Sequence, residues 1–412
     1  MSPSTQSTAF ETVSRENGAT FVHEYRETPP IVAIRIFLPG GSASESASQH
    51  GIAELTADLL TTQTKERDMY EFGRFVEDHG LKISGSAGHD YTLFSFTCTS
   101  DYREELLQLL NEIFMSPGFS EQAFERLKEQ QLSKIKQRND KAFDTAMNEA
   151  MKALYGDHPY NHDNDGSLDT VESLGIDDIR SYYENNYTTQ KGIVSAVGDI
   201  QREELISGFD NLVLPAEEPS LAPPVTESGA QRNYVEMDVD QPTHMLAYPA
   251  GKIADPSYPS TKVLNGLLGG GMSSILFNEI REKRSMGYQV GCSFPSRRED
   301  SAFLIYLGGG KEDGTEFRNI LDEIIHEIAE SGPEKKALRR AREYIKGNFL
   351  LNHETHGKSA WYRGFYEILG RGADFDDEYP ELVDRVDSEQ VQSACSEILV
   401  NQAPSFVTVR PK

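Results

Sequence analysis

The same order of secondary-structure elements occurs twice along this 412-residue chain, once on each side of a polar segment. The pattern predicts a strand that enters a glycine-rich turn, then two helices, two strands and two long helices in each half. The segment between, residues 214–233, is rich in Pro, Ser and Glu and has no apolar period. It is typical of an interdomain linker. We therefore expect domains 1–213 and 234–412, because one ordinary core does not grow to this size.

The repeated elements define the expected fold class. Residues 29–41 alternate as a strand should, and residues 243–251 open the second half in the same way. Leu106, Leu107 and Leu110 fall on one face of a predicted helix. We predict an α+β protein of two duplicated halves, each a mostly antiparallel β-sheet with helices packed on one face.

The charge of the chain excludes several partners. The formal net charge is −26, which argues against binding to nucleic acid or to an anionic membrane. It leaves two interpretations open, a solvated acidic surface suited to high salt and an acidic cavity that attracts basic peptides. The three cysteines, Cys98, Cys292 and Cys395, are too widely separated for a disulfide framework or a CxxC zinc site.

The hydropathy of the chain predicts a cytoplasmic protein. No run of residues approaches the roughly 18 apolar positions that span a membrane. The first residues, "MSPSTQSTAFETVSRENG", lack the basic-then-apolar order of a signal peptide. A periplasmic location stays possible if a leader has been removed.

The segment "HGIAELTADLL", residues 50–60, lies where a metal-binding helix could begin. Zinc would need two imidazoles one helical turn apart, a third ligand and a base for the attacking water. Here Glu54 and Asp58 form the i, i+4 pair, and two carboxylates without a histidine make a poor zinc site. The residues alone favour a solvated helix face.

Two histidine pairs are weaker candidates for a metal. His158 and His162 are four residues apart, but Pro159 between them argues against a helix that would bring the rings together. His353 and His356 lie near a helix end with no acidic pair of suitable geometry, so a surface helix is favoured there. A relocated metal site at His353 and His356 is left open as a third possibility.

The segment "LLGGGMSSILFNEIREKRSMGY", residues 267–288, is the most unusual of the sequence. Gly269, Gly270 and Gly271 end one helix and allow the backbone to approach another chain closely, so we predict that they bind substrate. Arg281 and Tyr288, held close together, could grip a peptide carbonyl or stabilise an oxyanion. The alternative is that Arg281 only interacts favourably with the negative end of the helix dipole and that Tyr288 packs in the core.

These segments resemble the M16 metallopeptidases, the family of pitrilysin, insulinase and the mitochondrial processing peptidase. The second-half segment is similar to the family's Gly-rich loop and its helix ending R-E-K-R-G-L-A-Y. "HGIAELTADLLTTQT" falls where the family has G-[IVT]-A-H-F-L-E-H-x-L-F-x-G-T, and "GDHPYNHDNDGS" resembles its G-x-H-P-Y-G loop. The resemblance runs from about residue 20 to about residue 405.

The resemblance implies a degenerate zinc motif. The family's first His falls on Glu54, its catalytic Glu on Ala57 and its second His on Asp58. The third ligand, a Glu in the family, falls on Lys134 or Ser133. A lysine there would put a positive charge where Zn²⁺ should be, so we expect no metal and no cofactor in this chain.

The resemblance also implies a role for the second half. In active members an Arg and a Tyr of the C-terminal half hold the substrate backbone over the zinc, and Arg281 and Tyr288 match them at the same spacing. Some bacterial members are two chains, one with HxxEH and one with only the Arg/Tyr pair. We therefore expect a zinc-less subunit that acts on peptides with an HxxEH partner, which alone carries zinc. The alternatives are a self-dimer and a structural or peptide-binding homologue without activity.

Overall fold

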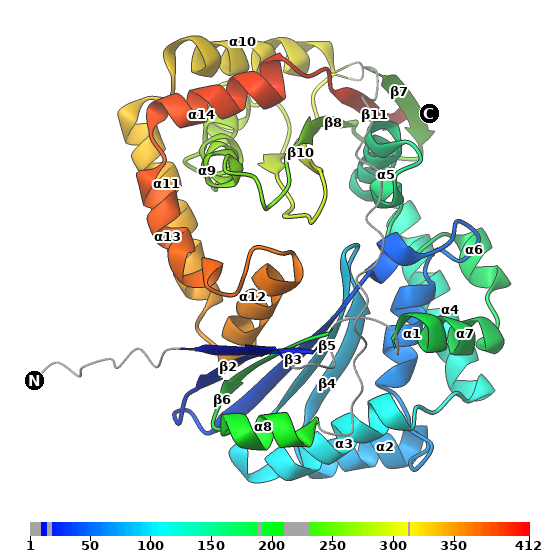
Figure 1. Cartoon of the computed structure of the whole chain (residues 1–412). Coiled ribbons are helices and arrows are strands. Elements are labelled where there is room, and N and C mark those ends of the chain that lie inside the picture. The colour runs from blue at the N-terminus through cyan, green and yellow to red at the C-terminus, as the bar shows by residue number, and fades with distance from the viewer. Residues whose placement is uncertain (1–9, 15–18, 188–191, 210–230, 312–313) are drawn as a thin grey trace, which may run out of the picture. The chain divides into compact units, whose positions relative to one another are not determined.

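The computed structural model describes residues 10–14, 19–187, 192–209, 231–311 and 314–412 (Figure 1). The chain forms two compact units, and each unit is described by itself. Unit 1 consists of Met1–Ile135, Asp163–Ser220 and Asn352–Asp376; unit 2 consists of Lys136–His162, Leu221–Leu351 and Asp377–Lys412. Each unit thus includes a segment from the other half of the sequence. Most of the expected linker, residues 214–230, lies outside the described residues.

Unit 1 contains a mixed sheet of six strands. Their order across the sheet is β1 (Glu11–Ser14), β2 (Thr20–Tyr25), β6 (Ile193–Gly198), β3 (Ile31–Pro39), β5 (Tyr91–Thr99) and β4 (Lys82–Ala87). Only β2 and β6 pair in parallel; the other neighbours are antiparallel. Strand β4 therefore forms a free edge of this sheet.

Helices cover both faces of the first sheet. On one face lie α1 (Ile52–Leu60), α2 (Met69–Asp78), α3 (Arg103–Met115), α4 (Glu121–Asn139), α6 (Leu168–Ser173), α7 (Ile176–Asn186) and α8 (Arg202–Gly208). The alternate β3 residues Ile34 and Ile36 enter this core. On the other face lies α12 (His356–Ile368), where Gly364 fits against the ring of Phe37 and Gly357 against the guanidinium of Arg35.

Unit 2 repeats this topology with five strands. Their order is β7 (Arg232–Met237), β11 (Ser405–Pro411), β8 (Thr243–Ala250), β10 (Ser301–Gly308) and β9 (Gln289–Ser293). The first two pair in parallel, and the others are antiparallel. Taken in this order, the five strands correspond one by one to β2, β6, β3, β5 and β4 of unit 1. The duplication and the α+β class expected from the sequence are therefore confirmed.

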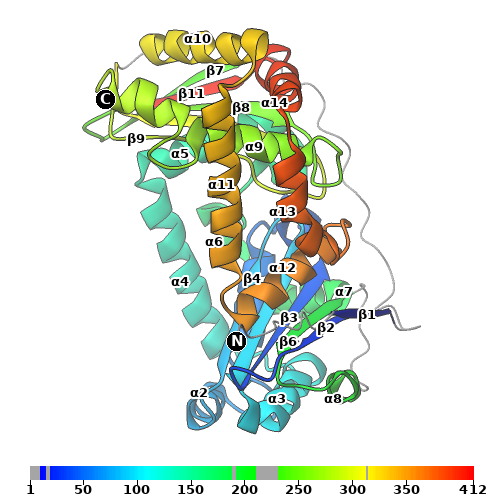
Figure 2. The same cartoon turned by 90° about the vertical axis from the view of Figure 1, so that its left-hand side faces the viewer.

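The helices of unit 2 also lie on two sides of their sheet. They are α5 (Ala142–Tyr155), α9 (Tyr258–Gly269), α10 (Thr315–Ser331), α11 (Lys335–Asn352), α13 (Phe375–Arg385) and α14 (Ser388–Cys395), with the π-helices η4 (Phe277–Glu282) and η5 (Ser396–Val400). Helix α5 packs on β8 and β11, and its Phe143 contacts Tyr306 of β10 edge to face, with ring centroids 5.0 Å apart. Figure 2 shows α10 and α11 running in different directions. The sequence predicted helices on only one face of each sheet. In each unit a helix from the other half of the sequence packs on the second face, α12 in unit 1 and α5 in unit 2.

Within the described ranges, no helix is both long enough and apolar enough to cross a lipid bilayer.

Candidate functional site

The degenerate zinc motif lies at the start of α1 in unit 1. Gly51 begins the helix with a φ of 98°, which a residue with a side chain rarely adopts. The Glu45 carboxylate accepts hydrogen bonds from the backbone N–H groups of Gly51 (3.0 Å) and Ala53 (2.8 Å). It thereby satisfies two donors of the first turn that have no partner within the helix. This start is fixed by residues outside the motif, so the helix does not depend on a metal.

Glu54 and Asp58 share one face of α1, as their spacing requires, but this face is not solvated. The Glu54 side chain is 14% exposed, and both residues are half-buried. Oε2 of Glu54 accepts a 2.6 Å hydrogen bond from the backbone N–H of Ala87 on β4. The solvated helix face favoured by the residues alone is therefore wrong, because β4 and the loop before α6 approach this side of the helix.

Lys134 of α4 brings a positive charge to these carboxylates. Its Nζ lies 2.7 Å from Oδ1 of Asp165 and 3.7 Å from Oε1 of Glu54. Asp165 is buried, and it precedes α6 in the loop that the sequence pattern likened to the family's G-x-H-P-Y-G segment. Of the two positions proposed for the third ligand, Lys134 thus faces the motif, and Ser133 is exposed beside it. The sequence offered no signal that Asp165 would join the cluster.

Burial has the largest single effect on the pKa of each group in this cluster. It raises the pKa of Glu54 to about 7, against the opposing effect of the Ala87 N–H, and it raises the pKa of Asp58 to about 6. For Lys134 burial lowers the pKa, but the hydrogen bond and negative charge of Asp165, with the charge of Glu54, outweigh it and raise the pKa overall. The ammonium is therefore held charged among groups that would otherwise favour their neutral forms.

The residues of this cluster do not fit zinc. The ammonium of Lys134 occupies the side of the motif from which a third ligand would have to coordinate. Ala57, which the resemblance aligns with the family's catalytic Glu, is fully buried, and a Cβ on Gly85 of β4 would come within 2.3 Å of its carbonyl oxygen. Among the described residues, no group of three or more His, Cys, Asp or Glu side chains is placed to hold a metal.

Three histidines of the two candidate pairs make contacts within their own unit. His158 is buried, and its Nδ1 accepts a hydrogen bond from the N–H of Tyr160 in a short 3₁₀ turn. His353 stacks on Tyr362 and contacts Asp376 through Nε2 at 2.9 Å. His356 is also buried, not on a surface helix, and its Nδ1 lies 3.1 Å from the carbonyl oxygen of Ile31.

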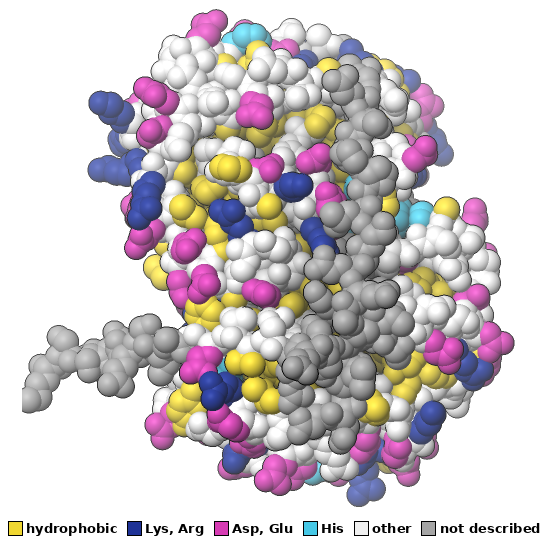
Figure 3. All heavy atoms as spheres, viewed as in Figure 1, with side chains coloured by type: hydrophobic (Ala, Val, Ile, Leu, Met, Phe, Trp, Pro, Cys, Tyr) yellow, Lys and Arg dark blue, Asp and Glu magenta, His cyan; other side chains and the backbone are white. Residues whose placement is uncertain are grey.

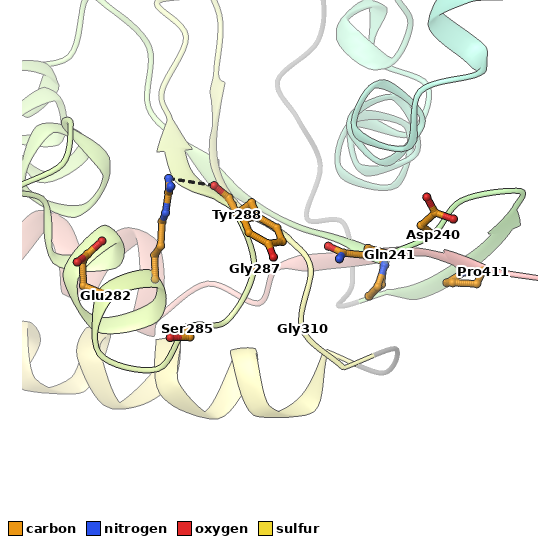
Figure 4. Close-up of a pocket in the computed structure, with 10 residues that line it drawn as sticks. Asp240, Gln241, Glu282, Ser285, Gly287, Tyr288, Gly310 and Pro411 are labelled. Carbon is orange, nitrogen blue, oxygen red and sulfur yellow. Dashed lines mark hydrogen bonds between the residues drawn. The ribbon is translucent and has the colours of Figure 1, made fainter.

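Arg281 and Tyr288 lie together in unit 2, on the rim of an open hollow of about 680 Å³ (Figure 4). Nη1 of Arg281 donates a 3.2 Å hydrogen bond to the backbone carbonyl of Tyr288, and its guanidinium lies 4.9 Å from the centre of the Phe277 ring. Tyr288 is 76% exposed. The alternative of a core tyrosine is therefore wrong. The phenol is free to contact a ligand.

The hollow gathers polar groups that are distant in sequence. Its lining also includes Asp240, Gln241, Pro242, Glu282, Ser285, Gly287, Gly310 and Pro411. Glu282, Ser285 and Gly287 belong to the segment 267–288 that the sequence singled out. The others had no signal in the sequence, because the loops after β7 and β10 and the last strand contribute them without a shared motif.

The backbone between Arg281 and Tyr288 is unusual. Residues Phe277–Glu282 form a π-helix, a form that is rare and often found at functional sites. Ser285 has a φ of 52°, the one positive value among the described non-glycine residues. Such a conformation costs on the order of 1 kcal/mol in a residue with a side chain. The strained turn sets the direction in which Tyr288 leaves the helix.

The three glycines predicted to bind substrate line another part of unit 2. A Cβ on Gly269 would come within 2.5 Å of Sγ of Cys292 on β9, and one on Gly270 within 2.3 Å of the Gly266 carbonyl oxygen. Gly271 has a φ of 78° and lies against the Tyr344 ring. None of the three lines the hollow that Arg281 and Tyr288 border. Close packing already explains the absence of side chains here, and a contact of these glycines with substrate stays a prediction.

Strand β4 offers backbone groups at the edge of the first sheet. The N–H of Gly88 donates to the Tyr91 carbonyl at 2.8 Å, so by the antiparallel alternation Ile83, Gly85 and Ala87 direct their N–H and C=O groups away from β5. The outward N–H of Ala87 is the group that Glu54 occupies. An added strand would therefore have Ile83 and Gly85 as its free partners.

Comparison with known proteins places the chain in one family. Residues 20–163 match Insulinase (Peptidase family M16), and residues 173–345 match the Peptidase M16 inactive domain. A Bacillus subtilis protein named uncharacterized zinc protease YmxG is 24% identical over 358 residues, which are 86% of this chain and 87% of that protein. A Helicobacter pylori protein named non-peptidase homolog YmxG is 23% identical over 343 residues, covering 81% of this chain and 78% of that protein.

Solved structures share the fold over almost the whole length. A peptidase M16 inactive domain from Pseudomonas fluorescens matches with a TM-score of 0.90 at 23% identity, covering 98% of each chain. A protease from Helicobacter pylori matches with a TM-score of 0.89 at 19% identity, covering 98% of this chain and 100% of the other. The chain therefore belongs to the M16 peptidase family.

Proposed function

We propose that this chain is the subunit without zinc of a two-chain M16-type peptidase. It would supply Arg281 and Tyr288 to peptide bound at the zinc site of an HxxEH-containing partner. The observation that carries the proposal is the placement of both side chains on the rim of an open polar hollow, with the Tyr288 ring 76% exposed. A tyrosine so exposed contributes little to the core, so its position is better explained by contact with another molecule.

The two side chains suit a peptide carbonyl. The guanidinium of Arg281 has five N–H donors, and the hydrogen bond to the Tyr288 carbonyl uses one of them. The remaining donors and the Tyr288 hydroxyl can point at an oxygen that gains negative charge as the peptide bond is attacked. Metal-bound water and the general base would belong to the partner, because the cluster around Lys134 cannot hold zinc.

A peptide could also bind along the edge of unit 1. Among the described residues, the outward backbone groups of Ile83 and Gly85 on β4 have no partner, and an extended peptide can add to such an edge as one more strand. The serines that alternate with them, Ser84 and Ser86, are exposed and place no bulky side chain beside the strand. This mode of binding serves both an active pair of chains and a chain that only binds peptide.

The test mixes the purified chain with an M16 protein that retains HxxEH and follows cleavage of a peptide library. Activity should arise that neither chain has alone. Arg281→Ala and Tyr288→Phe should reduce kcat by about 10²-fold to 10³-fold, as the loss of an oxyanion donor does, and should leave assembly intact. Tyr70→Phe, a change at another exposed tyrosine (77%), is the matched control. Full turnover in both variants would contradict the assigned roles.

A second candidate is a structural or peptide-binding homologue without a catalytic partner. The observation that favours it is the hydrogen bond of Arg281 to the backbone carbonyl of Tyr288, which reduces the donors available to a substrate. In that case, mixing would yield no proteolysis, and fluorescent peptides would bind to the isolated chain. Ile83→Pro on β4, which removes an outward N–H of the edge, would weaken such binding, whereas Tyr288→Phe would leave it unchanged.

A further inference from the structure

A second hollow of unit 2 is separate from the one that Arg281 and Tyr288 border. It has a volume of about 410 Å³, and the two hollows share no lining residue. Its walls come from the start of β7, the middle of α10 and the chain that runs from η5 into β11. Figure 2 shows α10 next to β7 and β11. The volume is within the range of about 300 to 1,000 Å³ that is usual for small-molecule sites.

The floor of this hollow is apolar. Ile325 of α10, Leu399 of η5 and Phe406 of β11 line it and are buried, and so is Pro404. The charged side chains that line the hollow are more exposed than these, so they form its rim. An apolar group placed on this floor leaves water without displacing a polar partner of the protein. The floor therefore favours a ligand with an apolar body.

Charged side chains of β7 and α10 form the rim, which Arg232, Arg318, Asp322 and His326 line. Nε of Arg318 donates hydrogen bonds to both carboxylate oxygens of Asp322, at 2.8 and 3.0 Å. Within the described part of the chain, the two Nη groups of Arg318 have no hydrogen-bond partner. The guanidinium of Arg232 lies 5.1 Å from the centre of the Phe406 ring, which places it above the apolar floor. Even with His326 neutral, the rim has an excess of positive charge, and Arg318 keeps donors for an acceptor outside the protein.

The hydroxyl of Tyr248 is a buried polar group close to this rim. On β8, Tyr248 is two residues from Leu246, which pairs with Phe406 of β11, so its ring lies on the face of the sheet that bears the hollow. Among the described residues, no group forms a hydrogen bond with this hydroxyl, although the side chain is fully buried. Burial raises the pKa of Tyr248, and the charges of Arg318 and Asp322 act on it in opposite directions, which places the hydroxyl near that pair. The Arg318 end of the hollow is thus its more polar end.

We propose that this hollow binds a small organic acid. The carboxylate of the ligand contacts the guanidinium groups of Arg318 and Arg232, and its apolar body lies on the buried floor. A planar carboxylate matches the fork of N–H donors that an arginine presents. An inorganic anion would leave the apolar floor in water, and a cation would meet two guanidinium groups at the rim. The site is independent of the peptidase role, because it uses none of the residues assigned to that role.

The overall charge of the chain makes binding of an acid depend on this local cluster. The chain has a net charge of −26, and Figure 3 shows acidic side chains spread across one face of the molecule. Such a surface repels anions at long range. At about 0.15 M salt the Debye length is about 8 Å, which screens the repulsion while a contacting pair of carboxylate and guanidinium persists. Binding is therefore measured at this salt concentration.

The test follows the methyl group of Ile325 by NMR in the full chain with isoleucine methyl labelling, and the Ile325→Val variant assigns its signal. The probe hydrocinnamate should shift this signal saturably, with a Kd of about 1 mM or less. The amide of the same acid lacks the charge and propanoate lacks the ring, so each should bind about tenfold more weakly. L-Phenylalanine distinguishes amino acids from other acids, because its ammonium group adds attraction to Asp322. Tighter binding than that of hydrocinnamate assigns the site to amino acids, and weaker binding assigns it to acids without an amino group.

Two variants and a matched control locate the carboxylate. Arg232→Gln and Arg318→Gln should each weaken hydrocinnamate binding by about fivefold to tenfold, since each removes one guanidinium. Arg339→Gln, at an exposed arginine of α11 outside the hollow, changes the net charge equally and should bind as the wild type does. The methyl spectrum verifies that each variant is folded. An Ile325 signal that stays in place up to about 10 mM acid would overturn the proposal. So would equal binding of the acid and its amide, or unchanged binding in both arginine variants.

Discussion

Lys134 lies with its Nζ 2.7 Å from Oδ1 of Asp165, and it is one of the two residues that the resemblance places at the family's acidic third zinc ligand. The positive charge that a metal would supply to this part of unit 1 is thus supplied by a side chain. Glu54 and Asp58 are half-buried beside it, and burial raises the pKa of each carboxyl. Lys134 partly offsets the cost of burying these carboxylates, so the residues of the degenerate motif can be tested through the stability of unit 1 as well as through activity.

Replacing Lys134 by Met should destabilise unit 1. The ammonium is 60% exposed, whereas the Asp165 and Glu54 side chains are 8% and 14% exposed. Loss of a partner from a buried pair costs several kcal/mol, but solvent reaches this lysine, so we expect a loss of about 1 to 2 kcal/mol at pH 8. Urea denaturation measures it. Lys136→Met, at an exposed position on the same helix, is the control and should change stability by less than about 0.5 kcal/mol.

Glu54 should make unit 1 less stable as the pH rises toward 7. Its pKa in the folded chain is about 7, above the ordinary value of 4.5, so between these values the folded state binds more protons than the unfolded state. Stability from this group is therefore greatest at low pH and falls as the pH rises through the folded pKa. Glu54→Gln keeps an acceptor for the Ala87 N–H and should be more stable than wild type at pH 8 by on the order of 2 kcal/mol.

The measurement is the difference in urea stability between wild type and Glu54→Gln at pH 5, 6, 7 and 8. This difference removes the contribution of the other carboxylates, which both proteins share. It should grow with pH and level off above pH 7. Glu125→Gln, an exposed change on α4, should show no such growth. A difference that is constant with pH would mean that Glu54 titrates normally.

The sequence predicted the architecture because each element carries its own signal. The strand pattern and the hairpins recur in both halves, and the duplicated sheets follow from that repetition. Which sheet a helix covers has no local signal, and for this reason the exchange of α5 and α12 between the halves was not foreseen. Their apolar faces specify a helix that packs on a sheet, but not the sheet on which it packs.

The candidate site was predictable where residues are linked by a motif. Lys134, Arg281 and Tyr288 were identified from their places in the family pattern, although their roles in catalysis stay predictions. Asp165 was not identified, because the family pattern of its loop gives no spacing that links it to Lys134. The φ of Ser285 was also beyond prediction, since serine has no preference for the left-handed region.

Gly269 should tolerate no side chain, for reasons of packing. A Cβ there would come within 2.6 Å of the backbone nitrogen of Cys292, so the end of α9 or strand β9 must shift. We expect Gly269→Ala to lose about 2 to 4 kcal/mol. Gly347→Ala in the open face of α11 is the matched contrast and should gain up to about 1 kcal/mol, because alanine favours helix. Equal stability of both variants in urea would show that the loop adapts.

Ser285 should reveal the strain in the turn before Tyr288. Its φ of 52° suits glycine, so Ser285→Gly should relieve steric cost and lose no more than about 0.5 kcal/mol, despite the greater freedom of glycine in the unfolded chain. Ser285→Val should lose about 2 kcal/mol, because a β-branched side chain is poorly accommodated there. The same two changes at the exposed Ser273, whose φ is not positive, should show no such contrast in urea denaturation. If valine and glycine at position 285 are equally stable, the turn relaxes in solution and does not set the direction of Tyr288.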